Sequence, residues 1–239
     1  AIISPILGAI ADFSAAKKRF LFIFSSISWL FTALLFFVQE GDVFIGMLFF
    51  IIAEIGYRAG QVFYNSLLPE IADPDEMGRV SGNGWAIGSF GGILALLILL
   101  PLIVLIEGTI VVRLSLVFTS FYFAAAAMPL LFWIKEKAVP KELPSGKTIF
   151  SVAFDRLIET AKTLGDFKDF IRFIISFLVY NDGILMALNF ASIIGAVLFG
   201  MAQEQLIIFM IIVQATSVVG AYVAGMIGKK IGFKRTLVY

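Results

Sequence analysis

Apolar stretches long enough to cross a lipid bilayer are the feature that most constrains the fold of this chain. A spanning α-helix needs about 20 mostly apolar residues, because the hydrocarbon core offers no water to satisfy backbone polar groups. The sequence has six complete stretches of this kind between two partial ones, which we interpret as portions of two further helices. The complete spans are predicted at 20–38, 43–67, 80–106, 111–134, 170–199 and 206–227, and the partial ones at 1–11 and from 235 onward.

The composition agrees with an all-α, polytopic membrane protein built as helical bundles. Hydrophobic residues make up 60% of the 239 residues and charged residues 15%, whereas soluble domains are about half apolar and about a quarter charged. The net charge of +1 gives no basis for a nucleic-acid partner, and the sequence contains no Cys and no His. We therefore expect a lipid bilayer as partner and no catalytic residue, cofactor or metal site.

Lys and Arg are concentrated in alternate connections between the spans, and this pattern orients the chain. Among the 18 basic residues, the two outside these connections are Arg58 and Arg113. Since cytoplasmic loops carry an excess of Lys and Arg, the basic connections are predicted to be cytoplasmic. The acidic segment 69–76 lies on the same side, but acidic residues have little weight in this rule.

The segment 135–169 is the longest non-membrane stretch. Apolar residues recur at helical spacing from Thr148 to Leu164, which predicts a short amphipathic helix on the cytoplasmic membrane surface. The simpler interpretation is a linker between two bundles, and both can hold. We therefore expect an N-terminal bundle over 1–134 without its first helix, a cytoplasmic linker over 135–169, and the beginning of a C-terminal bundle over 170–239.

One short motif occurs twice, at corresponding positions in the two predicted bundles. Aligning Gly8 with Gly225 places the basic pair Lys17–Lys18 on the basic pair Lys234–Arg235. Parallel repeats related by an axis along the membrane normal are a known plan of transporters. The repeat therefore favours two structurally related halves.

The first copy resembles the cytoplasmic signature between the second and third helices of major facilitator superfamily carriers. Asp12 follows Gly8 at the expected distance, whereas Ala15 stands where a Gly is usual. The second copy has Lys229 in place of the Asp, so a gating pair made by that Asp is not expected there. The resemblance assigns a cytoplasmic gating motif to Gly8, Asp12, Lys17, Lys18, Gly225, Gly232, Lys234 and Arg235.

Longer motifs are similar to the vacuole effluxer-like branch of that superfamily. They are the segments 63–72 (FYNSLLPEIA), 78–88 (GRVSGNGWAIG) and 180–183 (YNDG). The resemblance covers the whole chain, from the second into the ninth membrane helix of the family. It implies a secondary carrier working by alternating access, and some relatives are linked to amino-acid efflux from vacuoles. It also implies the cell (inner) membrane if the protein is bacterial and the vacuolar membrane if it is fungal.

Four polar residues share one face of the span 43–67. They follow each other at spacings of four, three and four residues, and a charge at the bilayer centre costs about 3 kcal/mol even on a lenient scale. This face is therefore predicted to line a cavity or to contact other helices. Glu54 and Arg58 can pair along the helix, and the alternative is that this pair is purely structural and holds helices together. The candidates for substrate binding or proton coupling are Glu54, Arg58, Gln61 and Asn65.

A second candidate site lies in the span 170–199. Asn181, Asp182 and Gly183 predict a kink or break, because Gly allows the helix to open. Such breaks are tolerated where the freed backbone groups line a cavity. Asp182 is a candidate for proton coupling or for binding a substrate amine, and Asn189 on the same face is a weaker candidate. The alternative is a kink in which Asp182 bonds within the protein.

The leading hypothesis is a secondary active transporter of a small polar solute, with amino-acid efflux and proton coupling as its finer forms. A membrane enzyme is disfavoured, because the chain offers no catalytic set, phosphate loop or metal motif. A non-transporting membrane sensor or a lipid-handling relative of the carriers is the other alternative. Substrate, direction and coupling ion are left open by the sequence.

Overall fold

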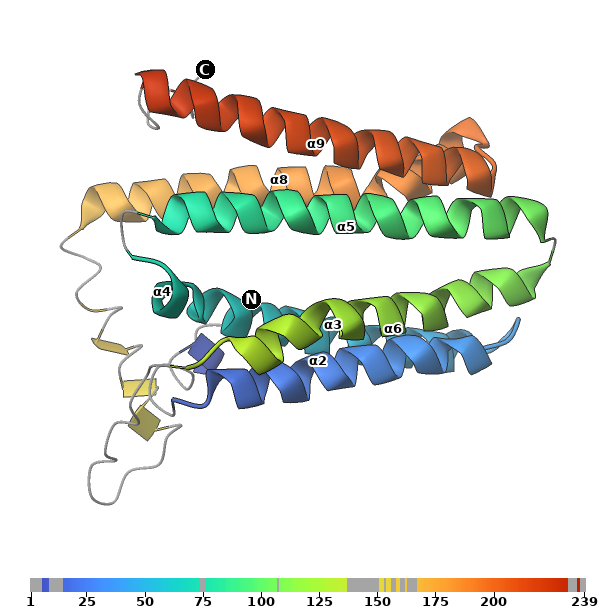
Figure 1. The fold of residues 1–239 in the computed structure, drawn as a ribbon, viewed down its shortest axis with the longest axis horizontal. Coiled ribbons are helices and arrows are strands. Elements are labelled where there is room, and N and C mark those ends of the chain that lie inside the picture. Colours follow the sequence, from blue (N-terminus) through green and yellow to red (C-terminus); the bar gives the residue numbers. More distant parts are fainter. Residues whose placement is uncertain are drawn as a thin grey trace. The chain divides into compact units, whose positions relative to one another are not determined.

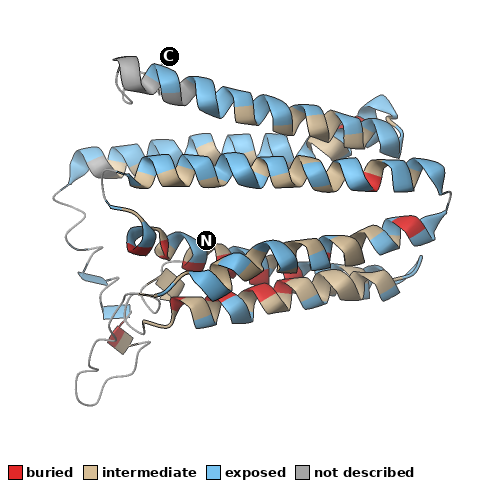
Figure 2. Ribbon diagram, in the orientation of Figure 1, coloured by how far each residue is buried: buried red, intermediate tan, exposed pale blue. Residues whose placement is uncertain are grey.

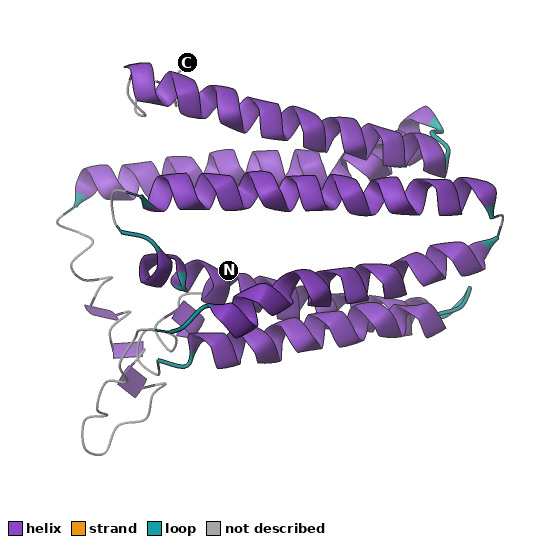
Figure 3. Cartoon of the chain, in the orientation of Figure 1, coloured by secondary structure: helices purple, strands orange, loops and turns teal. Residues whose placement is uncertain are grey.

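The computed structural model describes residues 6–8, 15–73, 76–106, 108–136, 151–152, 154–155, 158–159, 162, 167–231 and 236. Within these residues the regular structure is helical and contains no strand, as Figure 3 shows. Six helices are long and apolar enough to cross a membrane, which confirms the predicted class of an all-α polytopic membrane protein.

The helices follow the predicted spans closely (Figure 1). Each predicted span matches one long helix whose ends differ from the prediction by a few residues. The elements are α2 (Lys17–Leu34), η1 (Leu35–Phe37), α3 (Val43–Ser66), α4 (Leu68–Ile71), α5 (Met77–Leu105), α6 (Thr109–Trp133), α8 (Lys168–Phe199) and α9 (Gln203–Ile231).

Two compact units make up the chain. The first comprises residues Ala1–Asp75 and Val112–Tyr180, and the second comprises Glu76–Val111 and Asn181–Tyr239. Helices α2, α3 and α4 and most of α6 therefore belong to the first unit, whereas α5 and α9 belong to the second. The predicted bundles 1–134 and 170–239, with their linker, stay a prediction.

Helices α2 and α3 pack closely in the first unit because glycines line their contact. A Cβ atom on Gly56 would lie 2.7 Å from the Phe24 carbonyl oxygen and 2.9 Å from the Ser28 nitrogen, both backbone atoms of α2. Closer to the C-terminal end of α3, Phe63 is fully buried and stacks on the rings of Phe20 and Phe24, with ring centroids 5.2 and 5.6 Å away. Figure 2 shows buried residues along these helices.

Helix α6 joins this pair through hydrogen bonds to the backbones of α2 and η1. The Ser120 hydroxyl donates to the Trp29 carbonyl at 2.7 Å, and Nε of Arg113 donates to the Phe36 carbonyl at 2.6 Å. The ring of Trp29 also meets Phe123 edge to face, with centroids 6.0 Å apart. Polar side chains between membrane helices serve in this way as interhelical glue.

In the second unit, α5 packs on α9. A Cβ atom on Gly92 would lie 3.7 Å from Nε2 of Gln214, whereas nothing lies within 4 Å of the corresponding position on Gly88. Gly88 and Gly92 are therefore not equivalent, because Gly92 lies against a polar side chain of α9 and Gly88 does not. Close approach at small residues is the usual packing mode of membrane helices.

Helix α8 is continuous from Lys168 to Phe199, so a break at 181–183 is contradicted, whereas a kink there stays a prediction. One Gly inside a helix costs about 1 kcal/mol relative to Ala, which a long apolar helix tolerates. Of the predicted amphipathic segment 148–164, the residues 151–152, 154–155, 158–159 and 162 are described and are helical. The remainder of that prediction lies outside the described residues.

Candidate functional site

The polar residues of α3 lie on the side of the helix opposite to its contact with α2. At 3.6 residues per turn, the two sets of residues are about half a turn apart. The buried set consists of Ala53, Gly56, Ala59, Gly60 and Phe63. The polar set consists of Glu54, Arg58, Gln61 and Asn65, of which Glu54 and Gln61 are half-buried and the other two are exposed.

Glu54 and Arg58 form the ion pair that their spacing predicts. Nε of Arg58 lies 2.6 Å from Oε1 of Glu54, and the side chains are 51% and 41% exposed respectively. The described residues of the first unit therefore leave this pair open. A ligand can reach such an open pair and take the place of either partner. It could not reach a fully enclosed pair.

Tyr57 joins the polar face and was not predicted from the sequence. Nε2 of Gln61 donates to the Tyr57 hydroxyl at 2.9 Å, and the guanidinium of Arg58 lies 5.7 Å from the centre of the Tyr57 ring. The same ring meets Phe123 of α6 at 6.0 Å. Its position four residues before Gln61 was the available signal, because residues at that spacing are neighbours on a helix. The polar face thus has an aromatic edge.

The candidate residues of α8 lie on the part of this helix that belongs to the second unit, from Asn181 onward. Asn181 is half-buried, whereas Asp182 and Gly183 are exposed, and a Cβ atom on Gly183 would meet nothing within 4 Å. The backbone of Asn189 belongs to the same helix, but its side chain lies outside the described residues. Asp182 and Gly183 are therefore accessible in the described part of the unit, and the roles of all these candidates stay a prediction.

Two acidic residues outside the predicted gating motif, Glu70 and Glu136, bind its first basic pair. Nζ of Lys17 lies 2.7 Å from Oε1 of Glu70 in α4 and donates to the Ser66 carbonyl at 3.1 Å. The Lys17 and Glu70 side chains are 9% and 8% exposed. Glu136, just beyond α6, accepts from the backbone amides of Lys17 and Lys18 at 2.7 and 3.4 Å. This charged cluster joins α2, α4 and the end of α6.

Within the acidic segment 69–76, Glu70 is thus paired with a basic residue of the first motif. The orientation of the chain stays a prediction. No local signal pointed to this pair, because its members are 53 residues apart.

Ala15 adopts a left-handed backbone conformation, with φ of 46°. This conformation is unfavourable for residues with a side chain and natural for Gly, which is the usual residue at this position of the motif. Gly8 and Gly225 are helical, whereas Asp12, Gly232, Lys234 and Arg235 lie outside the described residues. Among the residues that the structure describes, no group of three or more His, Cys, Asp or Glu could hold a metal ion.

Comparisons with known proteins agree with these features. The family described as "Vacuole effluxer Atg22 like" matches residues 1–239. The chain is 26% identical over 244 residues to an uncharacterized MFS-type transporter, YxiO, of Bacillus subtilis (strain 168), covering 99% of this chain and 56% of that protein. It is 33% identical over 93 residues to an uncharacterized protein of Aquifex aeolicus (strain VF5), covering 39% of this chain and 24% of that protein.

The chain thus spans about half the length of the MFS-type relative that it matches. No solved structure matches it. The six apolar helices and the family match show a multi-pass integral membrane protein. The match over all 239 residues shows that this chain belongs to the Atg22-like vacuole effluxer family.

Proposed function

We propose that the full-length protein is a secondary active transporter that moves a small polar solute by alternating access. The observation that carries the proposal is the open Glu54–Arg58 pair on the face of α3 that points away from α2. Ionisable residues inside membrane spans are expensive and are kept mainly where they serve a pathway. Membership of the effluxer family and the similarity to an MFS-type transporter support the same function.

The chemistry of the polar face favours a zwitterionic solute such as an amino acid. Arg58 can receive a carboxylate through its Nη groups, and Glu54, one helical turn away, can receive an ammonium group. The Gln61 amide and the Tyr57 hydroxyl add neutral hydrogen-bonding groups beside the pair. A zwitterion would replace one internal ion pair with two external ones, so its binding leaves neither charge without a partner.

Ligand binding can be measured first, because a ligand that binds the folded state raises its apparent stability. The full-length protein in detergent is heated with amino acids, sugars or organic ions, and a shift with amino acids is expected. Arg58→Gln should abolish the shift, whereas Arg79→Gln, at an exposed pair elsewhere, should preserve it. An equal shift in wild type and Arg58→Gln would contradict the role of this face.

Transport itself is tested with the full-length protein in proteoliposomes. Uptake or exchange of the labelled solute identified by the thermal shift is expected. Binding without any exchange or accumulation would favour the non-transporting sensor, and chemical conversion of the solute would favour an enzyme. Either result would refute the carrier.

Asp182 supplies the proposed proton coupling, and this part of the proposal has its own test. If Asp182 carries the proton, Asp182→Asn loses proton-driven accumulation but keeps downhill exchange, because the neutral amide imitates the protonated acid. If Asp182 binds a substrate amine, exchange fails as well. Accumulation at the wild-type level by Asp182→Asn would remove Asp182 from both roles and leave it a structural residue of α8.

A further inference from the structure

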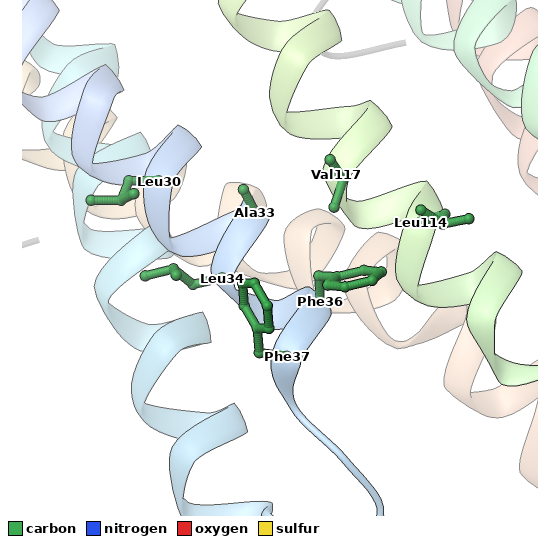
Figure 4. A pocket seen from close by; sticks show the side chains of 7 residues that line it. All are labelled: Leu30, Ala33, Leu34, Phe36, Phe37, Leu114 and Val117. Atoms are coloured by element: carbon green, nitrogen blue, oxygen red, sulfur yellow. The ribbon is translucent and has the colours of Figure 1, made fainter.

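An apolar crevice lies in the first unit, at the end of α2 remote from Lys17. Its volume is about 340 Å³, near the lower limit of about 300–1,000 Å³ that is typical of small-molecule sites. Figure 4 shows that residues of α2 and η1 form one wall and residues of α6 the other. The lining residues are Leu30, Ala33, Leu34, Phe36, Phe37, Leu114 and Val117.

A fixed cation stands at the rim of this crevice. Arg113, the residue before Leu114, donates through Nε to the Phe36 carbonyl at 2.6 Å, and its guanidinium lies 5.2 Å from the centre of the Phe36 ring. The ring of Phe36 is itself part of the crevice wall. Within the described part of the chain, the Nη groups of Arg113 have no hydrogen-bond or ion-pair partner. Their N–H groups can therefore bind an anion.

The position of Arg113 in the membrane narrows the class of ligand. It is one of the two basic residues outside the cytoplasmic connections, and the other, Arg58, is paired with Glu54. On the topology predicted from the basic connections, Arg113 and the crevice lie at the non-cytoplasmic ends of their helices, near the level of the lipid headgroups. A ligand that fits must present an apolar chain to the crevice and a negative group to the guanidinium.

We propose that this crevice and Arg113 bind one anionic phospholipid of the non-cytoplasmic leaflet. An acyl chain fills the apolar walls between α2 and α6, and the phosphate accepts hydrogen bonds from the Nη groups of Arg113. The Nε bond to Phe36 fixes the guanidinium plane, so that the remaining donors are ready for the phosphate. This site is independent of the proposed transport function.

The experiment uses the full-length protein in vesicles of phosphatidylcholine with or without phosphatidylglycerol. Lipids retained after gentle extraction are counted by native mass spectrometry, and phosphatidylglycerol is titrated in a thermal-unfolding assay. The wild type should retain one phosphatidylglycerol in preference to phosphatidylcholine. Arg113→Gln should bind it about fivefold more weakly, the effect of roughly one basic residue at a membrane surface. Arg79→Gln, at an exposed cytoplasmic pair, is the matched control and should bind as the wild type does.

Ala33→Phe fills the crevice while leaving Arg113 in place, so it tests the acyl-chain part separately. Loss of the retained lipid in both Ala33→Phe and Arg113→Gln supports the proposal. Retention that is unchanged in Ala33→Phe would overturn it, because the chain would then lie elsewhere. A wild type that retains no lipid would also overturn it and would show that another segment or a second copy covers the crevice.

Discussion

Breaking the buried ion pair between Lys17 and Glu70 should destabilise the protein more than any other single charge removal in the first unit. The two side chains are 9% and 8% exposed, with 2.7 Å between Nζ and Oε1. Changing one partner leaves the other charge buried beside a neutral side chain, which typically costs about 3–5 kcal/mol. Lys17→Met and Glu70→Met should each lower the free energy of unfolding by this amount.

The double change should be far less harmful than the sum of the two single ones. Two well-packed apolar residues can replace a buried ion pair with little loss of stability, since neither charge must then be desolvated. The pair Glu76–Arg79 is the matched control, because its side chains are 50% and 68% exposed. Exposed pairs contribute about 0–1 kcal/mol, so Arg79→Met should fall in that range.

The assay is equilibrium unfolding of the full-length protein in mixed micelles of a mild detergent and dodecyl sulfate, followed by circular dichroism. A double-mutant cycle isolates the interaction between the two side chains. Single changes at Lys17 and Glu70 that cost no more than Arg79→Met would refute the reasoning. So would a double mutant as unstable as the sum of the single mutants.

Three further predictions concern packing, strain and topology. Gly56→Ala should destabilise the protein by about 1–3 kcal/mol, because its Cβ atom would lie 2.7 Å from the α2 backbone. Gly82→Ala has open space around it and should not destabilise the protein, and thermal unfolding compares the two variants. Ala15→Gly should stabilise by about 1 kcal/mol, since it relieves a φ of 46°, and an unchanged or lower unfolding temperature would contradict the strain. Single cysteines at Ser14 and Phe233 should resist membrane-impermeant thiol reagents in intact cells, and labelling from outside would invert the topology.

The membrane helices could be predicted from the sequence because bilayer thickness and backbone hydrogen bonding leave few alternatives. Stretches such as 43–67 and 80–106 needed no tertiary information, and the spacing of Glu54 and Arg58 was sufficient to predict their contact. The length of the apolar stretches thus predicted the membrane helices, and helical spacing predicted the Glu54–Arg58 pair within one of them.

Contacts between distant segments could not be predicted in this way. Glu70 and Glu136 were not selected as partners of the basic motif, because their contacts with Lys17 depend on how α2, α4 and the end of α6 meet. Arg113 was noted from the sequence as a basic residue outside the basic connections, and its bond to the Phe36 carbonyl could not be predicted because it depends on the position of η1. The continuity of α8 through Gly183 was missed because the helix-breaking tendency of one Gly was overestimated.

The most direct test of the central claim asks whether the polar face of α3 lines a water-filled substrate pathway. Cysteines are placed singly at Gln61 on this face and at Ile55 on an exposed apolar part of the same helix, in full-length protein with any other cysteines replaced. If the face lines such a pathway, a water-soluble thiol reagent modifies Gln61→Cys rapidly and the transported solute protects it. Ile55→Cys faces lipid and stays unmodified. A Gln61→Cys protein as unreactive as Ile55→Cys, in the presence and absence of solute, would contradict it.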